Sequence, residues 1–237
     1  MTKTTVQEAP APYGKAVTEF CTLDDQRVVL HGVSWSTYKA LLNDLGDSRA
    51  CRLAFDSGDL EIMSPHFKHG RSEFTLGQMV VVLVEEFGLD CVPGASLTCE
   101  REDIEKAIEP DGCFYIQHAN DVADCEKIDL AIHPPPDLMI EVDISTNSSR
   151  KLAICAALGV PEHWLYNGSA LEIRLLKSGR YIVSEESAVF PGIPLSKIIA
   201  EFLKPRRRLL LANSHDFRLR IREEMRALSA GKKKRRI

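Results

Sequence analysis

The 237-residue chain lacks the features that mark membrane, secreted or fibrous proteins. Its unbroken apolar runs, such as residues 79–84 and 152–158, are at most seven residues long, whereas a membrane-spanning helix needs about 20 such residues. Residues 1–15 contain no apolar segment of the kind found in a secretory signal. Glycine (14) and proline (12) are too scarce for a fibrous or low-complexity protein. We therefore expect a globular, cytoplasmic protein with no membrane partner.

Closely spaced metal-binding cysteines and histidines are also scarce. The seven cysteines are scattered, odd in number and never spaced as Cys-x-x-Cys, which argues against a disulfide framework and a cysteine zinc site. His66 and His69 are three apart and could be ligands on a helix. Because no third histidine or cysteine lies nearby, we expect both to be surface loop residues. No phosphate-binding loop, dinucleotide fingerprint or serine-hydrolase elbow is present.

The net charge of −4 conceals an uneven distribution. From residue 205 onward the chain carries twelve Lys/Arg and three Asp/Glu, a charge of +9, so the first 204 residues carry −13. An acidic body with a basic arm indicates an anionic partner without identifying it.

The order of helical and strand-like patterns predicts a mixed α/β (α+β) domain with a central sheet. We expect a flexible lead over residues 1–17, one domain over 18–204, and a basic helix and tail over 205–237. Residues 70–88 form an apolar helix, and Asp-Ser-Gly at 56–58 joins two strands in a hairpin. In the arm, Phe217, Ile221, Met225 and Leu228 recur at helical spacing, with Ser214 as the expected start and Gly231 as the expected end.

Acidic residues stand in or beside apolar strands, where a carboxylate is costly to bury unless its charge is compensated. Asp111 comes just before the predicted strand CFYIQ, in EPDGCFYI, and Glu141 lies inside LMIEVDI. Asp143 is two residues beyond Glu141, on the same strand face, so a cation between them would relieve their repulsion. Oxygen ligands of this kind suit Mg²⁺ or Mn²⁺ better than zinc. The alternative is structural: Asp111 as a turn residue and Glu141 in an ion pair with an arginine.

Four stretches resemble the Uma-two family of restriction endonucleases, within the PD-(D/E)XK nuclease superfamily. The two specific ones are PPPDLMIEVDISTNSS, at 134–149, and KLAICAALGVPEHWLYN, at 151–167. LEIMSPHFKHG and IEPDGCFYIQ add weaker support, and together the stretches span about residues 50 to 185. The resemblance implies a restriction-endonuclease-like core, a mixed sheet flanked by helices, here followed by an amphipathic basic helix.

The resemblance also implies roles for particular residues. Asp111 matches the aspartate of the PD element and Glu141 the acid of the (D/E)XK element, and both would bind the metal ion together with a strand carbonyl. The superfamily has a lysine two residues after this acid, but here that position is Asp143. Asp143 is then either an additional metal ligand or a residue that contacts the ligands. Lys151, on the following helix, matches the displaced lysine, and we expect its ammonium within a few ångströms of Glu141. Glu73 matches a helix-borne acid that many such nucleases bring to the site, although a first-turn residue favoured by the helix dipole is an equal alternative.

These roles predict a Mg²⁺- or Mn²⁺-dependent endonuclease that hydrolyses phosphodiester bonds in DNA, double-stranded in the simplest case, with a homodimer left open. Ser145 and Ser148 could donate hydrogen bonds to phosphate oxygens, or could simply cap the helix. Arg218, Arg222 and Arg226, spaced four apart, would form a basic stripe beside the active-site cleft, or would pair with the acidic body. One alternative function is a nucleic-acid-binding protein that retains the nuclease fold with little or no catalysis, favoured by Asp143 at the usual lysine position. Another is a protein-interaction module whose basic tail binds an acidic partner.

Overall fold

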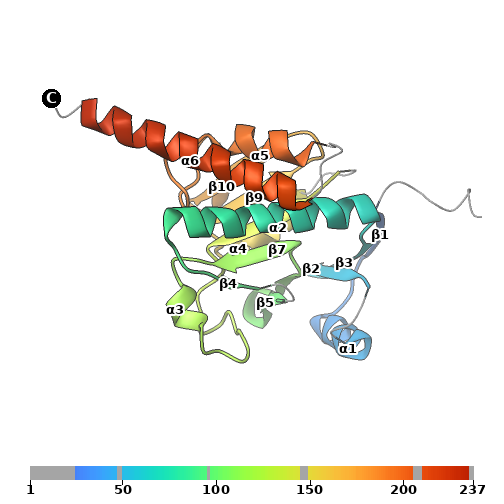
Figure 1. The fold of residues 1–237 in the computed structure, drawn as a ribbon. Coiled ribbons are helices and arrows are strands. Elements are labelled where there is room, and N and C mark those ends of the chain that lie inside the picture. Colours follow the sequence, from blue (N-terminus) through green and yellow to red (C-terminus); the bar gives the residue numbers. More distant parts are fainter. Residues whose placement is uncertain (1–24, 47–49, 95–96, 145–148, 205–209, 235–237) are drawn as a thin grey trace, which may run out of the picture.

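The computed structural model describes residues 25–46, 50–94, 97–144, 149–204 and 210–234. Helices alternate with short strands along the chain, as Figure 1 shows, so the mixed α+β class predicted from the sequence is confirmed. The strands divide into two sheets instead of one central sheet, and only the larger sheet is mixed.

The smaller sheet is wholly antiparallel and has the strand order β1-β3-β2-β6-β5. Its strands are β1 (Gln26–Leu30), β2 (Arg52–Asp56), β3 (Asp59–Ser64), β5 (Cys99–Arg101) and β6 (Lys106–Ile108), with the 3₁₀ turn η1 (Glu102–Ile104) between the last two. The predicted hairpin joins β2 to β3 through Ser57 and Gly58, both at positive φ (48° and 100°). Turns of this kind match the twist of an antiparallel pair.

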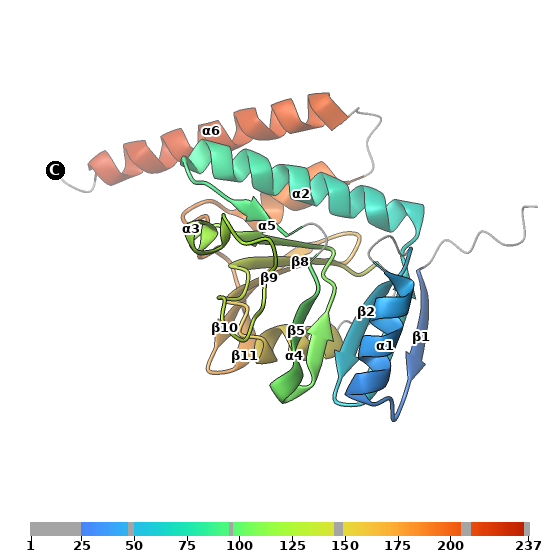
Figure 2. The same cartoon turned by 90° about the horizontal axis from the view of Figure 1, so that it is seen from below.

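Helix α1 (Trp35–Leu45) covers the smaller sheet (Figure 2). Ser34 caps it by accepting a hydrogen bond from the backbone N of Thr37 at 3.1 Å. Tyr38 is fully buried and stacks on Phe55 of β2, with 5.2 Å between ring centroids. This satellite core fixes β2, whose first residue is Arg52, against the rest of the protein.

The larger sheet has the order β11-β10-β9-β8-β7-β4. Its strands are β4 (Val92–Pro93), β7 (Gly112–Tyr115), β8 (Leu138–Val142), β9 (Glu162–Tyr166), β10 (Leu171–Lys177) and β11 (Arg180–Ser184). Only β8 and β9 run parallel, and helix α4 (Ser149–Ala157) lies in the connection between them. Gly159 follows the end of α4 with a positive φ (81°), a conformation that favours glycine after a helix.

Alternation along β8 sends its side chains to two different cores. Leu138, Ile140 and Val142 face the core that contains α2 (Phe67–Phe87), α5 (Leu195–Leu203) and α6 (Leu210–Lys234). Met139 faces the core that contains α4. Glu141 shares the face of Met139, and its carboxylate is therefore directed toward α4.

The helix predicted over 70–88 is α2, which begins three residues earlier, after His66. Figures 1 and 2 both show α6 running alongside α2, and the short helix α3 (Ala119–Val122) lies apart from them. Phe217 and Ile221 are fully buried in this contact, with Met225 and Leu228 packed at its margin. Within the part of the chain that the structure describes, no helix combines the length and apolar character needed to cross a membrane.

The ends predicted for the last helix were wrong. It starts at Leu210 rather than after Ser214, and it continues through Gly231 to Lys234. Asn213, inside the first turn, is buried and donates a side-chain hydrogen bond to the Phe202 carbonyl at 3.3 Å. Docking of this turn on α5 outweighs the local preference of Ser214 for a helix start.

Candidate functional site

The candidate catalytic residues come from four separate elements. Asp111 immediately precedes β7, Glu141 lies in β8, Lys151 in α4 and Glu73 in α2. The first three are almost completely buried, and Glu73 is half-buried. Charged groups are seldom buried without partners, so their contacts decide what this site can do.

Asp111 is held by contacts to both of its carboxylate oxygens. Oδ2 accepts a hydrogen bond from the backbone N of Val142 at 2.7 Å and lies 3.0 Å from Nε2 of His69, while Oδ1 is ion-paired with Arg52. Burial alone would raise the pKa of Asp111, but the hydrogen bond from His69 and the charges of Lys151 and Arg52 outweigh it, so its pKa is well below its usual range. Asp111 is therefore an ionised carboxylate at neutral pH, and its contacts join it to β2, α2 and β8.

Lys151 reaches back from α4 to Glu141, and its Nζ lies 2.6 Å from Oε2. This confirms the geometric prediction made from the sequence, and it makes the structural partner of Glu141 a lysine, not the arginine of the alternative. Burial, reinforced by the charge of Asp111 and opposed by Lys151, raises the pKa of Glu141 to about 7. Burial would lower the pKa of Lys151, but the charges of Glu141 and Asp111 hold it above its ordinary value.

The second oxygen of Glu141 is the unusual feature of this pair. Oε1 is buried and has no hydrogen-bond partner among the residues that the structure describes. Buried carboxylate oxygens are normally satisfied, because leaving one unpaired costs on the order of 1–3 kcal/mol. An unsatisfied oxygen beside an ionised aspartate suits a site built to accept a cation.

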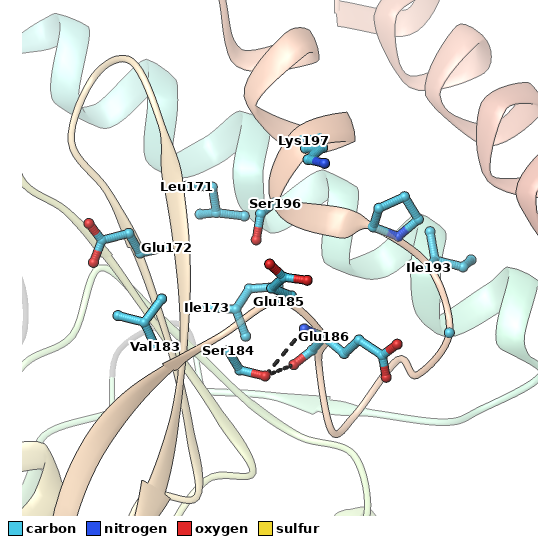
Figure 3. Close-up of a pocket in the computed structure, with 12 residues that line it drawn as sticks. Leu171, Glu172, Ile173, Val183, Ser184, Glu185, Glu186, Ile193, Ser196 and Lys197 are labelled. Atoms are coloured by element: carbon cyan, nitrogen blue, oxygen red, sulfur yellow. Dashed lines mark hydrogen bonds between the residues drawn. The ribbon is translucent and has the colours of Figure 1, made fainter.

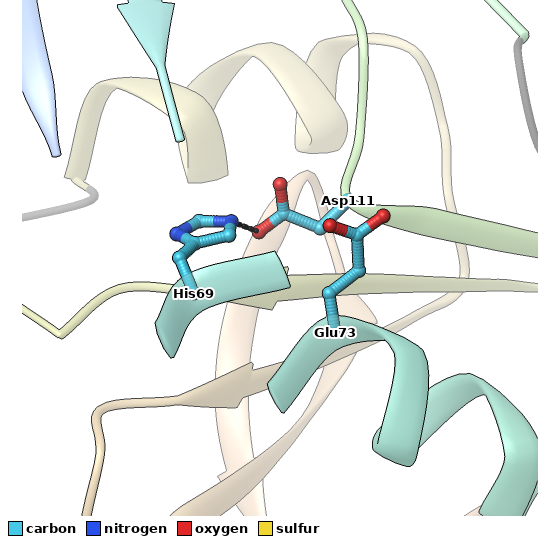
Figure 4. Close-up of side chains that lie close together, drawn as sticks. All are labelled: His69, Glu73 and Asp111. Atoms are coloured by element: carbon cyan, nitrogen blue, oxygen red, sulfur yellow. Dashed lines mark ion pairs between the residues drawn. The ribbon is translucent and has the colours of Figure 1, made fainter. Parts of the chain in front are cut away.

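His69 and Glu73 complete a cluster with Asp111, shown in Figure 4. One ligand atom from each of these three residues lies within 4.8 Å of the others. Nδ1 of His69 is also 2.8 Å from Oδ2 of Asp25, and burial, which would lower the pKa of His69, is outweighed by the hydrogen bonds and charges of Asp111 and Asp25, which raise it. The imidazole and carboxylate donors fit a divalent ion.

The expectation that His69 is a surface loop residue was wrong, since it lies in α2 and is 1% exposed. Sequence reasoning also missed Arg52, which is ion-paired with both Glu73 and Asp111. One signal was present: His69 and Glu73 are four residues apart, which places them on one face of a helix.

Asp143 lies just past the end of β8, where its backbone N donates to the Tyr166 carbonyl at 2.8 Å. It is buried, and its Oδ1 is 3.5 Å from the guanidinium of Arg27, which also reaches Glu61 at 3.4 Å. Arg27 compensates the charge of Asp143 from β1. A role of Asp143 as a metal ligand stays a prediction.

The proposed phosphate and DNA contacts fall in two places. Ser145 and Ser148 lie outside the described residues. On α6, Arg218 is ion-paired with Glu85 and Glu86, and Arg222 with Glu86 at 2.7 Å, whereas Arg226 is exposed. These acids end α2 roughly 20 Å along the helix from Glu73. Arg218 and Arg222 therefore pair with acidic residues of the body, far from the cluster of His69, Glu73 and Asp111.

A separate hollow of about 360 Å³ lies between the β10–β11 hairpin and the start of α5 (Figure 3). Its lining includes apolar side chains, among them Leu171 and Ile173, and polar ones, among them Glu185 and Ser196. None of the candidate catalytic residues lines it.

A family model matches residues 35–202, more than half of the chain. That family is Uma2 (Uma-two), described as putative restriction endonuclease. The matched segment runs from the start of α1 to α5 and contains Arg52, His69, Glu73 and the whole Asp111–Glu141–Lys151 group. Among curated proteins, none matches the chain in sequence.

Proposed function

The chain belongs to the Uma2 family, which is described as putative restriction endonuclease, and we propose that it is a metal-dependent endonuclease that hydrolyses phosphodiester bonds in DNA. The proposed reaction is of the PD-(D/E)XK type, with Mg²⁺ or Mn²⁺ as the ion. The substrate in the simplest form of the proposal is double-stranded DNA in the cytoplasm, and action on two strands would suit a homodimer.

The observation that carries this proposal is the Glu141–Lys151 ion pair beside the ionised Asp111. Replacing a buried ion pair by apolar side chains is often neutral or stabilising, so stability alone does not explain its presence. A buried lysine next to two carboxylates, one with an unsatisfied oxygen, supplies what phosphodiester hydrolysis requires: ligands for a cation and a fixed positive charge.

The proposed roles follow from these positions. Asp111 and Glu141 would hold the ion, with Asp143 as an added ligand or a neighbour of the ligands. When bound, the ion supplies Lewis acidity and a water of lowered pKa. The Lys151 ammonium would orient the attacking water and balance negative charge that develops on the phosphorus oxygens. Glu73 brings a further carboxylate from α2, and its partner Arg52 brings a guanidinium suited to a phosphate.

DNA contacts outside this centre are proposed from sequence position. Ser145 and Ser148 come shortly before α4 in sequence, and the N–H groups at the start of a helix favour a phosphate. Arg218, Arg222 and Arg226 would contact the DNA backbone along α6.

One observation favours the second candidate, a nucleic-acid-binding protein of the same fold with little or no catalysis. Asp143 occupies the position two residues after Glu141 where the superfamily has its lysine, and Arg27 compensates its charge. If Lys151 cannot act in place of that lysine, only binding remains.

Nicking of supercoiled plasmid by the full-length protein separates the two candidates. We expect cleavage with Mg²⁺ or Mn²⁺ and none with chelator. Glu141→Gln and Lys151→Met should abolish it, whereas Glu172→Gln, which breaks an ion pair with Arg174 on β10, should not. If the protein binds DNA but shows no metal-dependent nicking, the second candidate, a nucleic-acid-binding protein, is supported instead.

A further inference from the structure

We propose that His69 is a metal ligand through Nε2, forming a nitrogen-containing centre with Glu73 and Asp111, and that Arg52 fills this centre as an internal cation until a metal ion displaces it. The inference deepens the proposed function and rests on it only for the role of the ion in cleavage. The proposed centre shares Asp111 with the predicted oxygen ligands and takes its other two ligands, one of them a nitrogen donor, from α2. It also assigns Arg52 the position of a stand-in cation.

The first argument is the distance between His69 and Asp111. Nε2 of His69 lies 3.0 Å from Oδ2 of Asp111. Two neighbouring ligands of an octahedral ion with bonds of about 2.1 Å are about 3.0 Å apart. The two atoms therefore already have the separation that adjacent ligands of Mg²⁺ or Mn²⁺ adopt. Glu73 contributes the third ligand from the same helix as His69, one turn later (Figure 4).

The second argument is the contact on the other side of the imidazole. Nδ1 of His69 lies 2.8 Å from Oδ2 of Asp25, and both side chains are almost completely buried. Oδ1 of Asp25 accepts a hydrogen bond from the backbone N of His66 at 2.8 Å, which fixes the carboxylate at the start of α2. A histidine that binds a metal typically donates its other N–H to a carboxylate in this way. With the proton on Nδ1, the lone pair of Nε2 faces the carboxylate of Asp111, and a proton or a metal ion must lie between them.

The third argument is the position of Arg52. Its guanidinium is 2.7 Å from Oε1 of Glu73, is ion-paired with Asp111 and lies 3.4 Å from Nε2 of His69. One cation thus contacts all three proposed ligands. Because two positive groups cannot share these ligands closely, a divalent ion must displace the guanidinium. The side chain of Arg52 is 22% exposed, so it has solvent to move into, and there it could bind a phosphate.

The donor set predicts metal preference. Mg²⁺ prefers oxygen ligands and retains water, whereas an imidazole nitrogen favours the later divalent metals. We therefore expect Mn²⁺ to bind this protein more tightly than Mg²⁺, and we expect His69 to cause that difference.

The decisive measurement is pulsed electron paramagnetic resonance of Mn²⁺ bound to the full-length wild-type protein. Modulation from one directly coordinated imidazole nitrogen is expected, and its absence from fully bound Mn²⁺ would overturn the proposal. This measurement requires neither a variant nor DNA cleavage by the protein. His69→Gln should remove the nitrogen signal and weaken Mn²⁺ binding by at least about tenfold. Even substitution of a residue that only hydrogen-bonds to a metal ligand lowers metal affinity by about 10- to 100-fold. The matched control is His118→Gln, which removes another histidine paired with a buried aspartate, Asp137, and should leave both readings unchanged.

The proposed role of Arg52 predicts a change in Mn²⁺ affinity in the opposite direction. Arg52→Gln should tighten Mn²⁺ binding by about tenfold or more, because the ion no longer displaces a positive charge. Arg174→Gln, which breaks an ion pair on β10, should have no effect. Unchanged or weaker Mn²⁺ binding by a folded Arg52→Gln protein would sink the displacement part of the proposal.

Failure of this inference and failure of the nuclease function give different results. A nitrogen signal without plasmid nicking would uphold the metal centre and reject the nuclease. Nicking with Mn²⁺ that shows no nitrogen signal would uphold the nuclease and reject His69 as a ligand.

Discussion

Nζ of Lys151 and Oε2 of Glu141 are 2.6 Å apart, and the two side chains are 4% and 1% exposed. The pair joins α4 to β8 inside the protein and lies beside the ionised Asp111. Such a pair is strongly coupled, because removing either partner leaves the other charge buried without compensation.

A double-mutant cycle on this pair should show that coupling. Lys151→Met or Glu141→Gln alone should each lower the free energy of unfolding by about 3–5 kcal/mol. The double variant should lose much less than the sum of the two, because no buried charge is left unpaired. Urea unfolding monitored by circular dichroism measures all four proteins. Additive losses would mean that the two side chains do not interact in the folded protein in solution.

The buried His163 of β9 should give the protein a pH-dependent stability. It is fully buried, and neither ring nitrogen has a hydrogen-bond partner among the described residues. Burial, with the charges of Arg174 and Lys151, lowers its pKa to about 3. The unfolded chain therefore takes up a proton below about pH 6.5, and the folded protein does not until far lower pH. Stability should fall as pH falls through this window, with a slope approaching about 1.4 kcal/mol per pH unit.

His163→Leu tests this directly by removing the titrating group. The difference in unfolding free energy between wild type and variant should change steadily from pH 6.5 to pH 4.5 and stay flat above pH 7, because carboxylates common to both proteins cancel in the difference. A difference that does not vary with pH would show that His163 is protonated as easily in the folded protein as in the unfolded chain.

The sequence predicted those parts of the fold and site that depend on neighbours along the chain. The β2–β3 hairpin follows from Asp-Ser-Gly, and the contact of Lys151 with Glu141 was predicted from the family resemblance, which places the lysine on the helix after the strand. The two motifs specific to the family, at residues 134–149 and 151–167, contain both Glu141 and Lys151. These features need only local geometry and one strand-to-helix connection.

The sequence did not predict the features that depend on distant segments. His69 is buried because Asp25 and Asp111 flank it, 44 and 42 positions away in sequence, and Arg52 reaches Asp111 from another sheet. Nothing in SPHFKHG alone distinguishes such a histidine from an exposed one. Likewise, α6 begins early because Asn213 docks on α5, a contact with no local signal.

Helix α6 should be an integral part of the folded protein, although the family match ends at residue 202. Phe217 is fully buried against Phe202, with 5.4 Å between ring centroids, whereas Leu219 of the same helix is 45% exposed. Phe217→Ala should lower the unfolding free energy by about 3–5 kcal/mol, and Leu219→Ala should change it little. An equally small effect of both would indicate that α6 does not dock in solution.

The ion pairs on α6 predict unequal contributions of its arginines to DNA binding. Arg218 and Arg222 are held by Glu85 and Glu86, and the hydrogen bond from Arg222, with that from Arg218, lowers the pKa of Glu86. Glu86 therefore remains ionised at neutral pH, and its ion pairs already neutralise much of the positive charge of these two arginines. Arg226 is exposed and can exchange counterions for a phosphate.

If α6 contacts DNA, Arg226→Gln should therefore reduce the slope of log affinity against log salt by about 0.9, the value for one phosphate on double-stranded DNA. Arg218→Gln and Arg222→Gln should each reduce it by less, because binding a phosphate would first require breaking a pair with Glu85 or Glu86. Fluorescence anisotropy with a labelled duplex over a salt series measures all three. Equal reductions would show that the ion pairs open on DNA, and an unchanged slope for Arg226→Gln would remove this face of α6 from the DNA-binding surface.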